Sequence, residues 1–199
     1  MVGEVIVLHA VLDPQPRHGV TLQLLARLPY AKRLELEARE PAARHAGLCG
    51  IELALRGAAR IRGGDAPIAD LGFPTDGKPH LRGGPVFSIS HTARRVAVAL
   101  AAGGELGLDL EDAAADRAAG SAVTTRLARW TATEAILKAA GRGLREARGV
   151  ELDAARGTAT FAGRRYVLMP LAIAPDVIAQ LAADRMPASI VIESVDLDA

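Results

Sequence analysis

The chain has 199 residues, of which 50% are hydrophobic and 24% are charged. This length suits one domain, or two small halves that share a core, and the composition excludes an intrinsically disordered chain. Basic and acidic residues number 24 and 23, so the chain lacks the basic excess that is typical of nucleic-acid-binding proteins. Because only 3% of the residues are aromatic, Ala, Leu, Val and Ile must fill the core.

Cysteine usage and hydropathy indicate the compartment. Cys49 is the only cysteine, which excludes an internal disulfide and a CxxC zinc pair and is typical of a reducing compartment. The apolar N-terminus contains Glu4 and no basic cluster, so it predicts a strand and not a signal peptide. No apolar run reaches the roughly 18 residues that a membrane-spanning helix needs. We therefore expect a cytoplasmic protein that has no membrane partner.

The first elements in the chain are a strand and a long helical region. Residues 4–12 are apolar and β-like, and residues 20–62 have a helical periodicity that Pro29 and Pro41 interrupt. The best-supported helix covers residues 42–61, where apolar positions recur every three or four residues before a Gly-Gly pair.

Turn residues and short strands follow this region. We expect a short strand at residues 67–71 and a turn at residues 75–79. Three more strands are predicted in quick succession, at residues 86–90, 95–101 and 106–111. Their short connections predict antiparallel hairpins.

The rest of the chain is also predicted to contain both helices and strands. The Ala-rich residues 113–120 predict little regular structure, and a helix is expected over residues 123–144. A further short helix is expected at residues 175–186. Strands are predicted at residues 150–152, 158–161, 165–172 and 189–195.

This order of elements predicts an α+β fold with two similar halves. The halves would cover residues 1–103 and 104–199, meet near Gly103-Gly104 and form one compact unit. We expect each half to be a small antiparallel sheet packed on a long helix, in a pseudo-twofold arrangement with the active site between the halves.

Two carboxylates stand in the segment Gly107-Leu108-Asp109-Leu110-Glu111. On a strand, residues two apart share a face, so Asp109 and Glu111 would point together while the leucines face the core. Adjacent carboxylates repel each other unless a cation lies between them, and their hard oxygen atoms suit Mg²⁺. The alternative is a solvent-facing polar edge of an amphipathic strand.

A second group of polar residues lies on the predicted helix. Trp130, Glu134 and Lys138 are four residues apart and share a helical face. The sequence has only three lysines against 21 arginines, so a retained lysine suggests a compact charge with a specific role. In this interpretation Glu134 is a third carboxylate and Lys138 is a cation for phosphate. The alternative is an ordinary surface pair worth about 0.2–0.5 kcal/mol.

Potential binding groups also occur where strands meet turns. Ser90 and His91 end a predicted strand, a common place for binding side chains, and Lys78 stands between Gly77 and Pro79 in a turn. A lone histidine in a loop is more often exposed and without a function, and the alternative for Lys78 is a solvated position in the turn.

The order and spacing of these motifs resemble the 4′-phosphopantetheinyl transferases, in particular the larger, monomeric type built from two halves. The resemblance covers residues 77–144, about a third of the chain. It rests on four motifs in sequence order: Gly77-Lys78-Pro79, Ser88-Ile89-Ser90-His91, Gly107-Leu108-Asp109-Leu110-Glu111, and Trp130 with Glu134 and Lys138 at four-residue steps.

The resemblance implies an enzyme that transfers the phosphopantetheine arm of coenzyme A to a serine of an apo acyl or peptidyl carrier protein. Asp109, Glu111 and Glu134 would hold Mg²⁺, or Mn²⁺ in its place, on the pyrophosphate. Lys138 would contact phosphate near the bond that breaks, and Glu134, or a water that it holds, would be the general base. Adenosine 3′,5′-bisphosphate would be released.

The resemblance also implies a coenzyme A site. Lys78, Ser90 and His91 would line it together with Lys138, and Arg44, by a looser alignment, would be a further phosphate contact. The sequence departs from the family pattern at Thr133, where relatives often have lysine. This departure keeps a catalytically weak or inactive coenzyme A-binding homologue as one alternative, and a metal-dependent phosphohydrolase with the same carboxylates as another.

Several arginines around the same helix suggest a partner surface. A face of this kind would suit an acidic carrier protein, and the alternative is a solvated helix face. The residues concerned are Arg126, Arg129, Arg142, Arg145 and Arg148.

Overall fold

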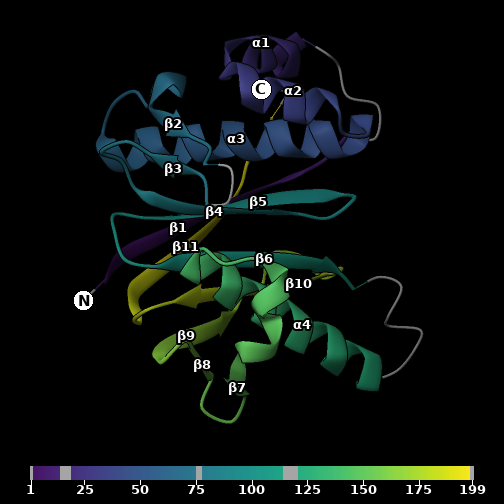
Figure 1. Ribbon diagram of the computed structural model, residues 1–199, viewed down its shortest axis with the longest axis vertical. Helices are drawn as coiled ribbons and strands as arrows, with labels where there is room; N and C mark the ends of the chain where they lie inside the picture. Colours follow the sequence, from purple (N-terminus) through teal and green to yellow (C-terminus); the bar gives the residue numbers. More distant parts are fainter. Residues whose placement is uncertain (1, 14–18, 75–77, 114–120, 198–199) are drawn as a thin grey trace.

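The protein has a mixed α+β fold with two main sheets. The computed structural model describes residues 2–13, 19–74, 78–113 and 121–197 (Figure 1). The predicted turn falls partly on residues 75–77 and the Ala-rich stretch mostly on residues 114–120, so these parts lie outside the described residues. Within the described ranges, none of the helices combines the length and the apolar character that crossing a bilayer requires.

The first sheet has four strands in the order β11-β1-β5-β4. They are β1 (Val2–Val11), β4 (Val86–His91), β5 (Arg95–Ala101) and β11 (Pro187–Ser194). β5 pairs antiparallel with both β1 and β4, whereas β11 runs parallel to β1. This pair corrects the expectation of a purely antiparallel sheet. The chain forms the whole second sheet before β11 returns beside β1, and such a long crossover allows parallel pairing.

Three helices precede β4, at α1 (Gly19–Arg27), α2 (Tyr30–Glu37) and α3 (Pro41–Arg62). Pro29 and Pro41 separate them as predicted, since proline is tolerated at a helix start but not in its interior. α3 packs on the first sheet, where Gly50 and Gly57 lie directly against the Ile89 and Leu100 side chains.

The strand expected at residues 67–71 is mostly a turn. A 3₁₀ turn, η1 (Ile68–Asp70), follows Pro67, and only then does the short strand β2 (Leu71–Gly72) pair with β3 (His80–Leu81). The Asp70 amide donates to the Pro67 carbonyl, which closes this turn locally.

The second sheet is antiparallel throughout, in the order β6-β10-β9-β8-β7. Its strands are β6 (Leu106–Asp112), β7 (Glu151–Asp153), β8 (Thr158–Phe161), β9 (Arg164–Pro170) and β10 (Val177–Ala183). β10 lies where the sequence predicted a helix at residues 175–186. That prediction is wrong, because β10 pairs with β6 along one edge and with β9 along the other, and this pairing outweighs the helix propensity of its alanines.

The predicted hairpin between β5 and β6 is also wrong. β5 already pairs with β1 and β4 along its two edges, so β6 starts the second sheet instead. The helix expected at residues 123–144 forms as α4 (Ser121–Ala140). It ends where Gly141 takes a positive φ of 65°, and the chain continues as the 3₁₀ helix η2 (Leu144–Gly149).

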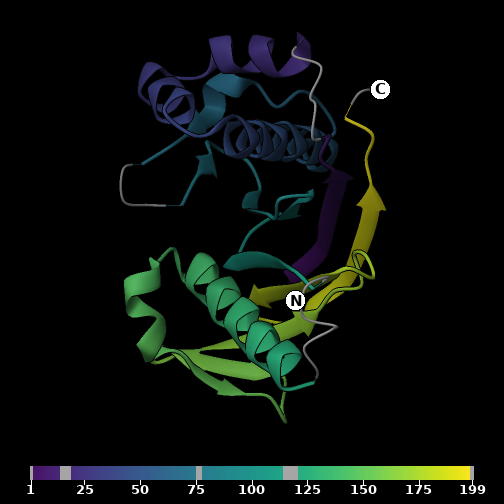
Figure 2. The ribbon, with the colours of Figure 1, turned by 90° about the vertical axis from the view of Figure 1, so that its right-hand side faces the viewer.

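The two sheets lie between the two long helices. α3 covers the outer side of the first sheet and α4 covers the second sheet at the opposite end of the molecule (Figures 1 and 2). One apolar cluster contains side chains of β1 and β5 together with those of β6 and β10, so the sheets share a core. The predicted division at residues 103 and 104 separates the long helices, but β11 belongs to the first sheet although it lies in the second part of the chain.

Candidate active site

Side chains join the edge strands of the two sheets. β4 and β6 are both edge strands, and the amides of Leu108 and Leu110 on β6 donate to Ser88 Oγ at 3.0 Å and Ser90 Oγ at 3.2 Å. Lys78 Nζ donates to the Leu106 carbonyl oxygen on the same edge. Side chains thus satisfy backbone polar groups of β6, although β4 and β6 belong to different sheets and form no ladder of backbone hydrogen bonds. The same contacts bring Ser90 next to β6.

Gly107 explains how close α4 lies to β6. A Cβ atom at this position would overlap the Ala135 carbonyl oxygen and the Ala139 amide nitrogen, both of which are backbone atoms of α4. Only glycine permits backbone to approach backbone in this way. The close packing brings Glu134 and Lys138 within reach of the carboxylates on β6.

Three carboxylates converge at this contact. Asp109, Glu111 and Glu134 each offer an oxygen atom, and the three atoms lie within 4.8 Å of one another. The prediction that Asp109 and Glu111 share a face is confirmed, and Leu108 and Leu110 are buried as expected. Asp109 is only 2% exposed, so the alternative of a solvent-facing polar edge does not fit it.

Lys138 pairs with Asp109 on the strand. Its Nζ lies 2.5 Å from Asp109 Oδ1 and 3.0 Å from Ser90 Oγ, and Ser90 Oγ donates to the same Oδ1 at 2.9 Å. Asp109 Oδ2, in contrast, is buried and has no hydrogen-bond partner among the described residues. A buried carboxylate oxygen without a partner is costly unless a cation or a hydrogen-bond donor reaches it.

The electrostatics of the cluster favour a cation. Burial and the negative charges of Asp109 and Glu111 raise the pKa of Glu134, while Lys138 and a hydrogen bond from the Trp130 indole oppose this rise. One ammonium group therefore leaves excess negative charge among three carboxylates. Because all the available donors are hard oxygen atoms, the residues fit Mg²⁺ or Mn²⁺.

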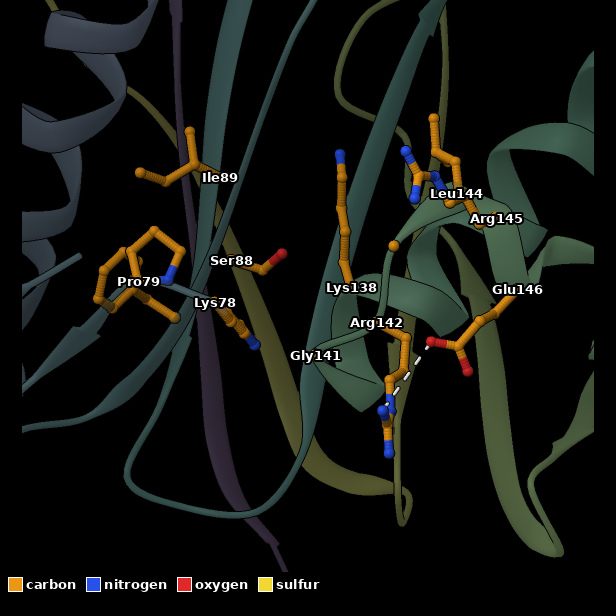
Figure 3. Close-up of a pocket in the computed structure, with 12 residues that line it drawn as sticks. Lys78, Pro79, Ser88, Ile89, Lys138, Gly141, Arg142, Leu144, Arg145 and Glu146 are labelled. Carbon is orange, nitrogen blue, oxygen red and sulfur yellow. Dashed lines mark ion pairs between the residues drawn. The ribbon is translucent and has the colours of Figure 1, made fainter. Parts of the chain in front are cut away.

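A cavity of about 910 Å³ lies next to the cluster. Figure 3 shows Lys78, Pro79, Ser88 and Ile89 along one side and Lys138, Gly141, Arg142, Leu144 and Arg145 along the other. Its lining has four cationic side chains, Lys78, Lys138, Arg142 and Arg145, against one carboxylate, Glu146, which lies 3.9 Å from Arg142. Lys138 thus belongs both to the cavity and to the carboxylate cluster.

Lys78 is half-buried at the seam between the sheets. Burial lowers the pKa of its ammonium group to about 8, against a smaller opposing effect of the Glu105 carboxylate. Lys78 borders the cavity while its nitrogen donates to the Leu106 carbonyl oxygen, so it holds β6 as well as facing the cavity.

The structure does not bring all the predicted residues to one place. His91 is exposed at the end of β4, and it lies close enough to the site for the charge of Lys138 to act on it. Desolvation and the positive charges of Lys138 and Arg39 lower the pKa of His91. Arg44 is half-buried in the first turn of α3, and no described contact links its side chain to the cluster.

Some residues of the site were missed by the sequence analysis. Ser88 shares a strand face with Ser90, and this Ser-x-Ser alternation was a usable signal. Arg142 and Arg145 were assigned only to a partner surface, although they line the cavity. The five arginines of that predicted surface are all exposed.

Two comparisons of the sequence with known families and proteins do not add to this description. A scan against protein-family models finds no match, and a search of curated proteins finds no significant match.

Proposed function

We propose that the protein is a 4′-phosphopantetheinyl transferase that acts on coenzyme A and an apo acyl or peptidyl carrier protein. One observation carries this proposal: a cluster of three carboxylates and a cationic cavity meet at Lys138. A substrate with a pyrophosphate near its centre needs both parts, since a divalent cation and fixed positive charges neutralise phosphate oxygens.

The proposed reaction is one phosphoryl transfer. A bond forms between the carrier serine Oγ and the β-phosphorus of coenzyme A, and the bond from this phosphorus to the bridging oxygen breaks. Adenosine 3′,5′-bisphosphate leaves with that oxygen. Glu134, or a water that it holds, accepts the serine proton, and its raised pKa supports this role.

The residues of the cluster have separate tasks in this reaction. Asp109, Glu111 and Glu134 would hold Mg²⁺ or Mn²⁺, which supplies charge neutralisation on the pyrophosphate when it is bound. Lys138 has three N–H donors and uses two of them on Asp109 and Ser90. The third remains for a phosphate oxygen at the edge of the cavity.

The larger architecture supports the two-half arrangement that we propose with this function. Each main sheet carries one long helix on its outer side, and the cluster lies at the seam between the sheets. For the carrier protein we propose a docking face around α4 and η2. The exposed arginines there suit an acidic partner, with attraction that added salt would screen.

Intact-mass measurement of several apo carrier proteins tests the function. After incubation with coenzyme A, Mg²⁺ and the protein, at least one carrier should gain the mass of a single phosphopantetheine arm, and EDTA should prevent the gain. Without any carrier, coenzyme A should stay intact.

The two alternatives give different results in the same experiment. Breakdown of coenzyme A without a carrier would indicate a phosphohydrolase that uses water on the same carboxylates. Binding of coenzyme A with no mass gain on any carrier would indicate an inactive homologue. Thr133 favours the latter, because its hydroxyl donates to the Arg129 carbonyl at 2.9 Å and supplies no positive charge.

A further inference from the structure

We infer that Ser90 is a positioning residue for the cation site and that Ser88 is the serine available to a ligand in the cavity. This reverses the role that the sequence suggested for Ser90. The inference rests on the proposed function only through the cation site of Asp109, Glu111 and Glu134.

The first argument is that the Ser90 hydroxyl has no hydrogen-bonding capacity left. A hydroxyl offers one proton and two lone pairs. Ser90 donates its proton to Asp109 Oδ1 at 2.9 Å and accepts from the Leu110 amide at 3.2 Å and from Lys138 Nζ at 3.0 Å. All three positions are used by the protein, so a phosphate oxygen has nothing to bind there.

The second argument concerns what these bonds do to Asp109. Its Oδ1 atom accepts from both Ser90 and Lys138, whereas Oδ2 is buried without a partner among the described residues. Ser90 and Lys138 therefore fix the carboxylate by one oxygen and leave the other for a cation. Hydrogen bonds behind a metal ligand commonly set its orientation in this way.

Ser88 lies two residues before Ser90 on the same face of β4, but it makes different hydrogen bonds. Its Oγ accepts from the Leu108 amide at 3.0 Å. Among the described residues, none accepts the proton of the Ser88 hydroxyl. Ser88 lines the cavity, and Figure 3 shows its hydroxyl directed toward the space beside Lys138. Its proton is therefore available to an anionic oxygen of a ligand.

The two serines form a matched pair for the test. Each accepts one amide hydrogen bond from β6, so Ser88→Ala and Ser90→Ala remove the same contact with the backbone. Cation binding is measured without any substrate by titration with Mn²⁺ or Mg²⁺, using calorimetry and the fluorescence of Trp130, the only tryptophan, which is hydrogen-bonded to Glu134. Coenzyme A binding is measured separately in EDTA.

Ser90→Ala should weaken cation binding by roughly 10–100-fold, the usual cost of losing a group that orients a metal ligand, and should leave coenzyme A binding in EDTA unchanged. Ser88→Ala should weaken coenzyme A binding in EDTA and leave cation binding unchanged. Ser90→Thr keeps the hydroxyl and should restore cation affinity, which separates the loss of a hydrogen bond from a general disturbance of the strand.

Equal losses of cation affinity in the two alanine variants would overturn the inference. So would a loss of coenzyme A binding in Ser90→Ala with cation binding intact, because Ser90 would then be the ligand contact. If the wild type binds the cation, and only Ser90→Ala weakens that binding, but no carrier gains mass, then the proposed function fails while the inference stands.

Discussion

The two helix-on-sheet contacts of this protein are close for different reasons. Where α3 meets the first sheet, the glycines belong to the helix, and the atoms that face Gly50 and Gly57 are side-chain atoms of Ile89 and Leu100. Where α4 meets the second sheet, the glycine is Gly107 on the strand, and the atoms that face it are backbone atoms of the helix.

The contact with α3 can therefore accommodate an added methyl group, whereas the contact with α4 cannot. Side chains change rotamer to accommodate an added methyl group, whereas helix backbone can move only together with the whole helix. The contact with α3 is part of an apolar core. The contact with α4 holds Glu134 and Lys138 against Asp109, and a small displacement of groups that bind a cation or a phosphate costs activity.

Gly107→Ala should therefore have the largest effect. We expect it to lower the free energy of unfolding by about 3 kcal/mol or more, at or above the usual range for overpacking, because the new methyl group would meet only backbone. Gly57→Ala is the control. It should cost ~1–3 kcal/mol from the contact with Leu100, partly offset by a gain of about 0.5–1 kcal/mol in helix propensity. Urea unfolding measures both, and a larger loss in Gly57→Ala would contradict the comparison.

Removing a carboxylate of the cluster should lower the rate of transfer without lowering the stability of the fold. Asp109→Asn should reduce carrier modification at least ~100-fold, as for other groups that stabilise transition-state charge, while leaving the thermal unfolding midpoint near that of the wild type. Asp109→Ala should abolish transfer as well. Asp112→Asn on the same strand is the control, because Asp112 pairs with Arg94 outside the cluster. Transfer by Asp109→Asn at the wild-type rate would show that the cluster holds no catalytic cation.

Lys78 links the two regions and should give the protein a specific pH dependence. Burial lowers its pKa from 10.5 to about 8, so between these values the unfolded chain binds more protons than the folded protein. The free energy of unfolding contributed by this group therefore rises with pH across that window. In urea unfolding, the stability of the wild type relative to Lys78→Met should be lowest below pH 8 and should increase up to pH 10.5. A constant difference would mean that Lys78 is not buried in the seam.

Thr133→Lys should have the smallest effect. Relatives of the proposed family often have lysine here, but Lys138 already lies 2.5 Å from Asp109 Oδ1, and Arg142 and Arg145 line the cavity. The new lysine should leave the turnover unchanged or lower it. Steady-state rates with coenzyme A and a carrier protein measure this, beside Arg129→Ala, because Arg129 lies four residues earlier on α4 and is the arginine that we expect to supply this charge instead. A clear gain of activity in Thr133→Lys, with no change in Arg129→Ala, would show that the site lacks a cation.

The sequence predicted the elements where the local signal was strong. Prolines separate α1, α2 and α3, and the alternation around Asp109 and Glu111 puts both carboxylates on one face. It failed at β10, where short apolar residues fit a helix as well as a strand, and at the connection between β5 and β6. Both failures concern which strands pair, and pairing depends on partners far away in the chain.

For the candidate site, the sequence by itself determined which chemical groups are present: three carboxylates, a helix lysine, and serines on a strand. Only the tertiary structure decided their partners. In the folded protein Lys138 pairs with Asp109, and the Ser90 hydroxyl makes all the hydrogen bonds it can. Ser88 lines the cavity. The reason is that residue spacing fixes the face on which a side chain lies, whereas its hydrogen bonds depend on how β4, β6 and α4 pack against one another.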